Sequence, residues 1–228
     1  SYTIGASPTI ELLKSKPEAV SEVYIHSKYK DCSLIEKLCG NHIYVIHDDK
    51  IFDRLGVNDN SFVLGVFQKY EIPLSTDRPH IVLVNPGDMG NLGTIIRSII
   101  GLGYKDLAII TPAADIYNPK TVRASMGALF KLNFRHFVSF DDYKTVFSEH
   151  KYFPFMLGAE YLLNYENCPE ADLFSLIFGN EAGGLEKSFL KVGQAIQIPQ
   201  TAEVDSLNLA VAAAIGVYTF ALKNKLIL

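Results

Sequence analysis

Beyond residue 80, the sequence alternates short apolar runs with longer helical segments. Apolar runs of this length are typical of strands buried on both faces, and strands that alternate with helices form parallel sheets. The pattern therefore predicts an α/β fold with a mostly parallel sheet covered by helices on both faces. The expected strands are His80–Val84, Leu107–Ile110, Phe134–Val138, Phe153–Leu157, Leu173–Phe178 and Ala195–Ile198.

Residues 1–72 have a different pattern, in which shorter helices and strands alternate. Ser7 followed by Pro8 is a suitable N-cap and first residue for a helix. Gly40 and Gly56 are suitable residues for ending two further helices. This part of the chain therefore predicts a small α/β/α domain. Its expected helices after the first are Ser33–Leu38 and Asp48–Leu55, and its expected strands are Glu22–His26, His42–Ile46 and Phe62–Phe67.

The segment Tyr70–Pro79 contains two prolines and has the period of neither a helix nor a strand. We predict a domain boundary here, with an N-terminal domain at 1–72, a linker at 73–79 and a second domain at 80–228. Few contacts should cross such a linker, so residues 80–228 should fold without the first domain.

The composition is that of an ordinary globular protein, with 48% hydrophobic and 20% charged residues. A net charge of −4 counts against a strongly basic nucleic-acid binder, although a local patch could still bind phosphates. The longest apolar stretch, Leu207–Leu222, is too short to span a bilayer, so no membrane segment is expected. Three scattered cysteines and no secretory signal pattern favour a cytoplasmic protein without a zinc site.

The first segment with candidate chemistry is NPGDMGNLGTIIRSIIGLG, at residues 85–103. Its glycines at 87, 90 and 93 permit a tight turn after a strand and close approach of a ligand. Their spacing is neither the dinucleotide fingerprint nor a P-loop. Isoleucines give the following helix an apolar face, and Asn91 and Arg97 are polar. Taken alone, Arg97 is better explained as a solvated helix residue.

Two more such segments follow later in the chain. LIFGNEAGGL, at residues 176–185, is a strand with a glycine-rich loop at its carboxyl end, where open α/β sheets place ligands. A plain turn would have the same composition. In IQIPQTAEVDSLNLAVAAAIGVYTFAL, at residues 196–222, a polar loop precedes a long helix that Ser206 or Asp205 can cap. Asn208 is either functional or a satisfied core amide.

Together, the three segments resemble the signature motifs of the SpoU/TrmH branch of the SPOUT methyltransferases. NLGTIIRS resembles the first motif, FGNEAGGL the second and IPQTAEVDSLNLAVAAAIGVY the third. Ala182 and Ala202 stand where the family often has glycine, and neither change removes a chemical group. NPKTVRASMGALFKL, at residues 118–132, resembles the family's intermediate helix. The likeness covers roughly residues 80–225, and the N-terminal segment resembles more weakly an L30e-like RNA-binding domain.

The resemblance implies a deep trefoil knot in the C-terminal domain and transfer of a methyl group from S-adenosylmethionine to a ribose 2′-hydroxyl of tRNA or rRNA. It also implies a homodimer with active sites completed across the interface, and the strongly apolar final helix agrees with a partner surface. The residues expected to bind the cofactor are Gly179, Asn180, Gly184, Ile198 and Leu207.

By the same resemblance, the catalytic residues are Asn91, Arg97, Glu181, Ser206 and Asn208. A guanidinium stays protonated, so Arg97 is better suited to binding a phosphate and stabilising charge on the 2′-oxygen than to acting as a base. Glu181 is its expected carboxylate partner, and the other three residues orient the arginine and the ribose. No metal is expected.

Two other functions compete with this interpretation. A nicotinamide-dependent dehydrogenase would also use glycine-rich turns, but the glycine spacing is wrong for one. A catalytically silent RNA-binding protein would not need Arg97, Asn180, Glu181, Ser206 and Asn208 together. The sequence does not identify the target nucleotide.

Overall fold

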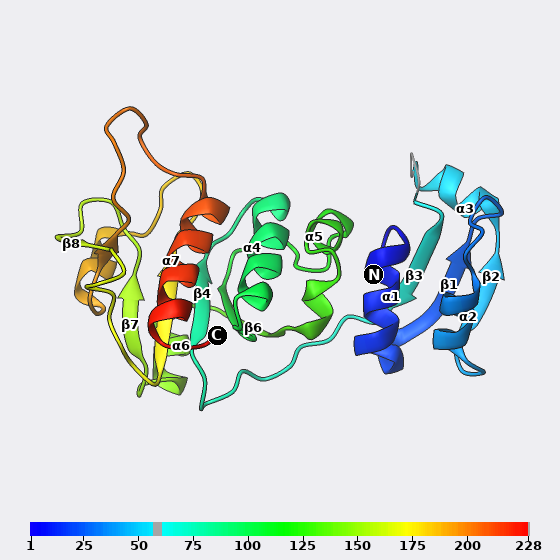
Figure 1. The fold of residues 1–228 in the computed structure, drawn as a ribbon, viewed down its shortest axis with the longest axis horizontal. Coiled ribbons are helices and arrows are strands. Elements are labelled where there is room, and N and C mark those ends of the chain that lie inside the picture. Colours follow the sequence, from blue (N-terminus) through cyan, green and yellow to red (C-terminus); the bar gives the residue numbers. More distant parts are fainter. Residues whose placement is uncertain (57–60, 228) are drawn as a thin grey trace.

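A computed structural model of the chain describes residues 1–56 and 61–227. Its largest sheet confirms the predicted α/β class (Figure 1). The strands are β4 (His80–Val84), β5 (Asp106–Ile110), β6 (Asn133–Phe137), β7 (Lys151–Pro154) and β9 (Phe174–Phe178). They are arranged in the order β6-β5-β4-β9-β7, and every neighbouring pair is parallel.

The predicted strand at Ala195–Ile198 is not part of this sheet. Only β10 (Ile196–Gln197) forms there, and it pairs with β8 (Tyr161–Leu162) in a separate two-stranded sheet. A bridge between Phe155 and Ile196 places β10 beside the chain that leaves β7. The apolar run at residues 195–198 therefore lies outside the main sheet, beside the chain that leaves the edge strand β7. Pro199 follows it directly.

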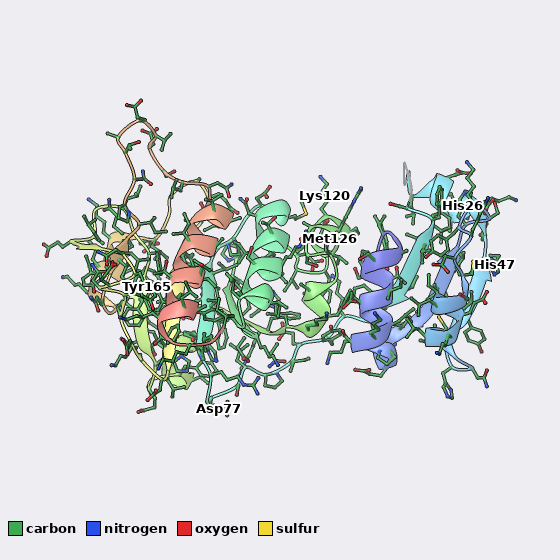
Figure 2. The ribbon with its side chains drawn as sticks, viewed as in Figure 1. His26, His47, Asp77, Lys120, Met126 and Tyr165 are labelled. Atoms are coloured by element: carbon green, nitrogen blue, oxygen red, sulfur yellow. The ribbon has the colours of Figure 1, made fainter. Side chains whose placement is uncertain are left out.

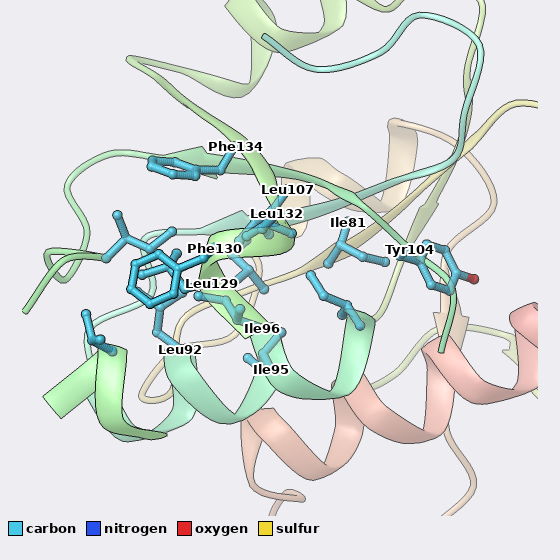
Figure 3. Close-up of a cluster of buried hydrophobic side chains, with 14 of the residues drawn as sticks. Ile81, Leu92, Ile95, Ile96, Tyr104, Leu107, Leu129, Phe130, Leu132 and Phe134 are labelled. Atoms are coloured by element: carbon cyan, nitrogen blue, oxygen red, sulfur yellow. The ribbon is translucent and has the colours of Figure 1, made fainter. Parts of the chain in front are cut away.

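The two faces of the sheet are covered by different helices because successive strand residues point to opposite sides. Ile81 and Leu83 of β4 pack with α4 (Met89–Gly101) and α7 (Leu209–Lys223). Val82, between them, faces α6 (Phe140–Val146) instead. Figure 3 shows part of the first cluster, in which Ile95 and Ile96 of α4 lie beneath the sheet.

Two predicted helices have different ends from those expected. The segment at 118–132 is broken into α5 (Pro119–Ala124) and a 3₁₀ helix (Ala128–Lys131), because Met126 (Figure 2) and Gly127 both have positive φ. Asn208, and not Ser206 or Asp205, caps α7 by accepting hydrogen bonds from the N–H groups of Ala210 and Val211.

The N-terminal part contains the three strands and three helices that the sequence predicts. Its sheet has the order β2-β1-β3, with β1 and β2 parallel and β3 antiparallel to β1. The first helix begins two residues earlier than expected, after Gly5 rather than Ser7, because Gly5 takes the N-cap position with φ 100°. The elements are α1 (Ala6–Ser15), the 3₁₀ turn Pro17–Ala19, β1 (Val20–Ile25), α2 (Ser33–Cys39), β2 (Tyr44–His47), α3 (Asp49–Arg54) and β3 (Val63–Phe67).

The expectation that few contacts cross the linker is wrong. Phe67 packs edge to face on Phe130 with ring centroids 5.4 Å apart, and Lys131 forms a 2.5 Å ion pair with Glu11. One buried apolar cluster includes residues from both sides of the linker. The linker itself is fixed, since Leu74 is buried and the Ser75 N–H donates to Asp106. A fragment starting near residue 80 would therefore expose apolar core surface.

Within residues 1–56 and 61–227, no helix has both the length and the apolar character needed to cross a membrane.

Candidate active site

The candidate site lies at the carboxyl ends of β4 and β9, two neighbouring strands in the middle of the sheet. From β4, the chain continues to β5 on one side, while β9 lies on the other side. The loops that follow these two strands therefore diverge, and open α/β sheets bind ligands in the crevice between such loops. The segments that contain the first two sequence motifs begin with these two loops, and the first motif itself lies in α4.

Glu181 joins the two loops. Its Oε2 accepts the Gly87 N–H at 2.9 Å, and its Oε1 accepts the Asp88 N–H at 3.0 Å and the Asn91 Nδ2 at 3.3 Å. Burial alone would raise the pKa of Glu181, but these donors outweigh burial and hold the pKa below its usual value. The carboxylate is therefore ionised and already satisfied, as expected for a positioning group.

The third motif is bonded to the same cluster through Asn208. The Asn208 Nδ2 donates to Asn91 Oδ1 at 3.1 Å, while its Oδ1 caps α7. Asn208 is thus both the helix cap and a member of the polar cluster. Asn180 fixes the loop after β9, because its Nδ2 donates to the Asn85 carbonyl at 3.0 Å and its Oδ1 accepts the Ala182 N–H at 2.7 Å.

A cavity of about 910 Å³ opens beside this cluster. All five residues predicted to bind the cofactor line it, and so do Glu181 and Ser206. Sequence reasoning missed the segment at residues 155–158, which also lines the cavity. Its position after β7 could have revealed it, since ligands gather at the carboxyl ends of parallel strands. The remaining apolar side chains of the lining are Phe178, Ala182, Leu185, Leu190, Leu209 and Ala212.

The cavity suits a small molecule that has both apolar and polar parts. Its volume lies within the range of small-molecule sites, and its walls are mainly apolar with a few polar groups. The loop after β9 turns back on itself, with Asn180 and Gly184 exchanging backbone hydrogen bonds. A Cβ at Gly179 would lie 2.1 Å from the Gly184 carbonyl carbon, so only glycine permits this turn. Backbone groups consequently form that wall of the cavity.

Arg97 lies outside both the cavity and the polar cluster. It is exposed on α4, and among the described residues no ion pair joins it to Glu181, so their expected pairing is wrong within one chain. The reason is helix geometry, because six residues at about 100° each place Arg97 about 120° around α4 from Asn91. The Asn91 side of the helix faces Glu181.

The surface of α7 next to α4 is apolar. The two helices contact each other on one face of the sheet (Figure 1). One side of α7 is buried, whereas Val211, Ile215 and Tyr218 are 49%, 39% and 50% exposed. These three residues recur at helical spacing and form a stripe along the outer side of α7.

The part of the chain that the structure describes contains no group of three or more histidine, cysteine, aspartate or glutamate side chains placed to hold a metal ion.

The parallel sheet and the loop-walled cavity define an α/β protein that binds a small molecule at the carboxyl ends of its central strands. The SpoU rRNA Methylase family model matches residues 78–218. The chain belongs to this family.

Relatives and solved structures agree with this membership. The chain is 30% identical over 212 residues to the 23S rRNA (guanosine(2553)-2′-O)-methyltransferase RlmP of Bacillus subtilis, covering 91% of this chain and 83% of that protein. It is also 30% identical over 157 residues to the 23S rRNA (uridine(2479)-2′-O)-methyltransferase of Streptomyces viridochromogenes, covering 64% and 53%.

The fold matches solved structures over nearly the whole chain. The SpoU methyltransferase AviRb from Streptomyces viridochromogenes, in complex with the cofactor AdoMet, superposes with a TM-score of 0.83 at 23% identity, covering 97% of this chain and 89% of that one. The AdoMet-bound rRNA methyltransferase from Sinorhizobium meliloti superposes with a TM-score of 0.79 at 21% identity, covering 96% and 85%. This likeness includes the N-terminal part.

Proposed function

We propose that the chain transfers a methyl group from S-adenosylmethionine to a ribose 2′-hydroxyl of ribosomal or transfer RNA. The observation that carries the proposal is the cluster of Asn91, Glu181 and Asn208, which joins all three motifs beside the cavity. The named relatives methylate 2′-oxygens of 23S rRNA, which supports ribosomal RNA as the substrate class. A cytoplasmic location, expected from the sequence, is part of the proposal.

The cofactor would lie in the cavity, held by Gly179, Asn180, Gly184, Ile198 and Leu207. Backbone groups at Gly179 suit hydrogen bonding to an adenine, and the Ile198 and Leu207 side chains suit contact with its ring. When bound, S-adenosylmethionine supplies a methyl group on a cationic sulfur, which makes the leaving group neutral. The deep trefoil knot implied by the motifs belongs to this proposal, with the cavity-lining loops at 179–185 and 198–207 as its crossing segments.

The protein residues have separate roles in this mechanism. Glu181 holds the loops after β4 and β9 together through three donors and so fixes one side of the site. Ser206, which is exposed and lines the cavity, would orient the ribose. Arg97 would bind the adjacent phosphate and stabilise the negative charge that develops on the 2′-oxygen. Because Arg97 lies outside the cavity of its own chain, we assign this role to the active site of a partner copy.

The N-terminal part would select the RNA as an L30e-like domain. Lys28, Lys30 and Arg54 are exposed there and can contact phosphates. His26 (Figure 2) is less suited to contacting a phosphate. Its ring packs on Phe52 and Phe62, and its Nδ1 lies 3.5 Å from an Asp49 carboxylate oxygen. With a net charge of −4, recognition should depend on RNA shape and a few local contacts.

Methylation of ribosomal and transfer RNA by the purified chain, with the new 2′-O-methyl marks mapped, tests the proposed reaction.

Gly179→Ala should weaken S-adenosylmethionine binding at least about tenfold, since the added Cβ forces the Gly184 turn out of place. Gly101→Ala, where a Cβ meets open space, is the control. Calorimetry on folded variants measures both. Binding of a nicotinamide dinucleotide in place of S-adenosylmethionine would contradict the proposal.

We expect a homodimer built on α4 and α7. Helix α7, which carries the exposed stripe of Val211, Ile215 and Tyr218, lies on the same face of the sheet as α4, which carries Arg97 (Figure 1). Burying the stripe would bring α4 toward a second copy. Ile215→Asp should give a monomer by light scattering at micromolar concentration, because a charge would be buried at the interface. Val138→Asp, at an 82% exposed site elsewhere, should leave the dimer intact. A wild-type monomer would contradict this expectation.

A further inference from the structure

We propose that Lys187 binds the carboxylate of the methionine end of S-adenosylmethionine and so distinguishes the whole cofactor from its nucleoside part. This assignment rests on the proposed function. Lys187 is the one lysine, arginine or histidine among the described residues that line the cavity. The other charged residues of the lining are Glu181, Glu186 and Asp205.

The charges of the cofactor determine where a cation is useful. S-adenosylmethionine carries two positive groups, the sulfonium and the amino group, and one negative group, the carboxylate. A lysine next to the sulfonium would repel it, whereas a lysine beside the carboxylate forms a charge-assisted hydrogen bond. The methyl group must face the polar cluster of Asn91, Glu181 and Asn208. The carboxylate, at the other end of the amino-acid chain, is therefore the group that suits Lys187.

The local structure holds Lys187 at the cavity while leaving its amino group available. It is the first residue of a 3₁₀ helix (Lys187–Lys191) that follows the buried Leu185. Phe189 of this helix is also buried, so the backbone beneath Lys187 is anchored on both sides. Lys187 is exposed and forms no ion pair with any residue in the described part of the chain. Glu181, by contrast, is committed to three donors.

The test compares two ligands that differ only in the amino-acid end. S-adenosylhomocysteine and 5′-methylthioadenosine are both neutral thioethers, and only the first carries the carboxylate and amino group. Lys187→Met should weaken S-adenosylhomocysteine binding about fivefold by calorimetry and leave methylthioadenosine binding unchanged. The loss should shrink at high salt. Lys187→Arg should retain most of the affinity. Lys191→Met, on the same 3₁₀ helix but outside the cavity lining, is the matched control.

The possible results separate this inference from the proposed function. If wild-type protein binds neither S-adenosylmethionine nor S-adenosylhomocysteine, the proposed function fails. If it binds both, but Lys187→Met weakens the two thioethers equally or neither of them, the role of Lys187 is wrong while the function stands. Loss of RNA binding alone in Lys187→Met would also overturn the assignment, because it would make Lys187 a phosphate contact. A selective loss for S-adenosylhomocysteine supports it.

Discussion

Arg97→Ala is expected to lower the rate of methyl transfer about 10²–10³-fold, the usual effect of removing one group that stabilises developing negative charge. Cofactor affinity should stay nearly unchanged, because Arg97 does not line the cavity. Arg97→Lys should also be poor, since lysine lacks the planar fork that binds a phosphate through two hydrogen bonds. Single-turnover assays and calorimetry measure the two quantities separately.

The control for this prediction is Arg123→Ala, which removes an exposed arginine from the neighbouring helix α5. Near-normal turnover of Arg97→Ala on its true RNA would refute the catalytic role. Mixing Arg97→Ala with Gly179→Ala tests whether Arg97 acts in the partner copy. A heterodimer would combine one intact cavity with one intact arginine, so about a quarter of the wild-type sites should recover if protomers exchange freely. No recovery in verified heterodimers would place Arg97 at the site of its own chain.

The second large effect is a loss of stability in acid, caused by two buried histidines at the amino ends of the strands. His80 is fully buried, with its Nδ1 2.8 Å from the Tyr143 hydroxyl and its Nε2 2.7 Å from the Ser75 carbonyl oxygen. His150 bonds to Ser175, and the two imidazole rings lie 4.4 Å apart. Burial and the neighbouring His150 lower the pKa of His80 to about 3, and burial lowers the pKa of His150.

Because the histidine pKa is lower in the folded chain, the unfolded chain binds more protons than the folded chain at pH values between the two pKa values. The free energy of unfolding should therefore be highest above pH 6.5 and should fall as the pH drops from 6.5 toward 3. For His80 alone, the loss by pH 5 is about 2 kcal/mol, at about 1.4 kcal/mol for each tenfold change in proton affinity. Most carboxylates titrate below this range, so the interval between pH 7 and 5 isolates the histidines.

Urea unfolding at several pH values between 7 and 5 measures this effect. His80→Gln should reduce the pH dependence even if it lowers stability at pH 7, because it removes the titrating group. His136→Gln, at a partly exposed histidine paired with Glu71, serves as the control. An unchanged pH dependence in His80→Gln would show that another group causes the loss.

The sequence was sufficient for features that depend on local patterns. Apolar runs predicted the strands of the main sheet, and glycine-rich loops after two of them predicted the walls of the cavity. The sequence was insufficient where two residues or groups could each make the same contact. Ser206 and Asn208 are both good N-caps, and the local sequence does not choose between them. In the structure Asn208 caps α7 and also donates to Asn91. Likewise, the sequence allowed a pair between Glu181 and Arg97. In the structure the Glu181 carboxylate instead accepts hydrogen bonds from the N–H groups of Gly87 and Asp88, in the turn after β4.

Long-range packing explains the other differences. The composition of Tyr70–Pro79 is that of a flexible connector, and nothing local shows that Leu74 is buried or that Phe67 meets Phe130. The segment at residues 155–158 was missed for a similar reason. Its apolar residues continue a strand-like run, but the chain turns after Pro154 and presents them to the cavity.

The core shared by the two parts affects how the protein would select the nucleotide that it methylates. Suppose that the N-terminal part binds the RNA at one feature. The distance from that feature to the cavity is then set by the packing of α1 on the 3₁₀ helix at Ala128–Lys131, not by the length of the connector. The distance between the bound RNA feature and the cavity is then fixed by the fold. The nucleotide that receives the methyl group is the one whose ribose lies at that distance from the bound feature, whatever its base.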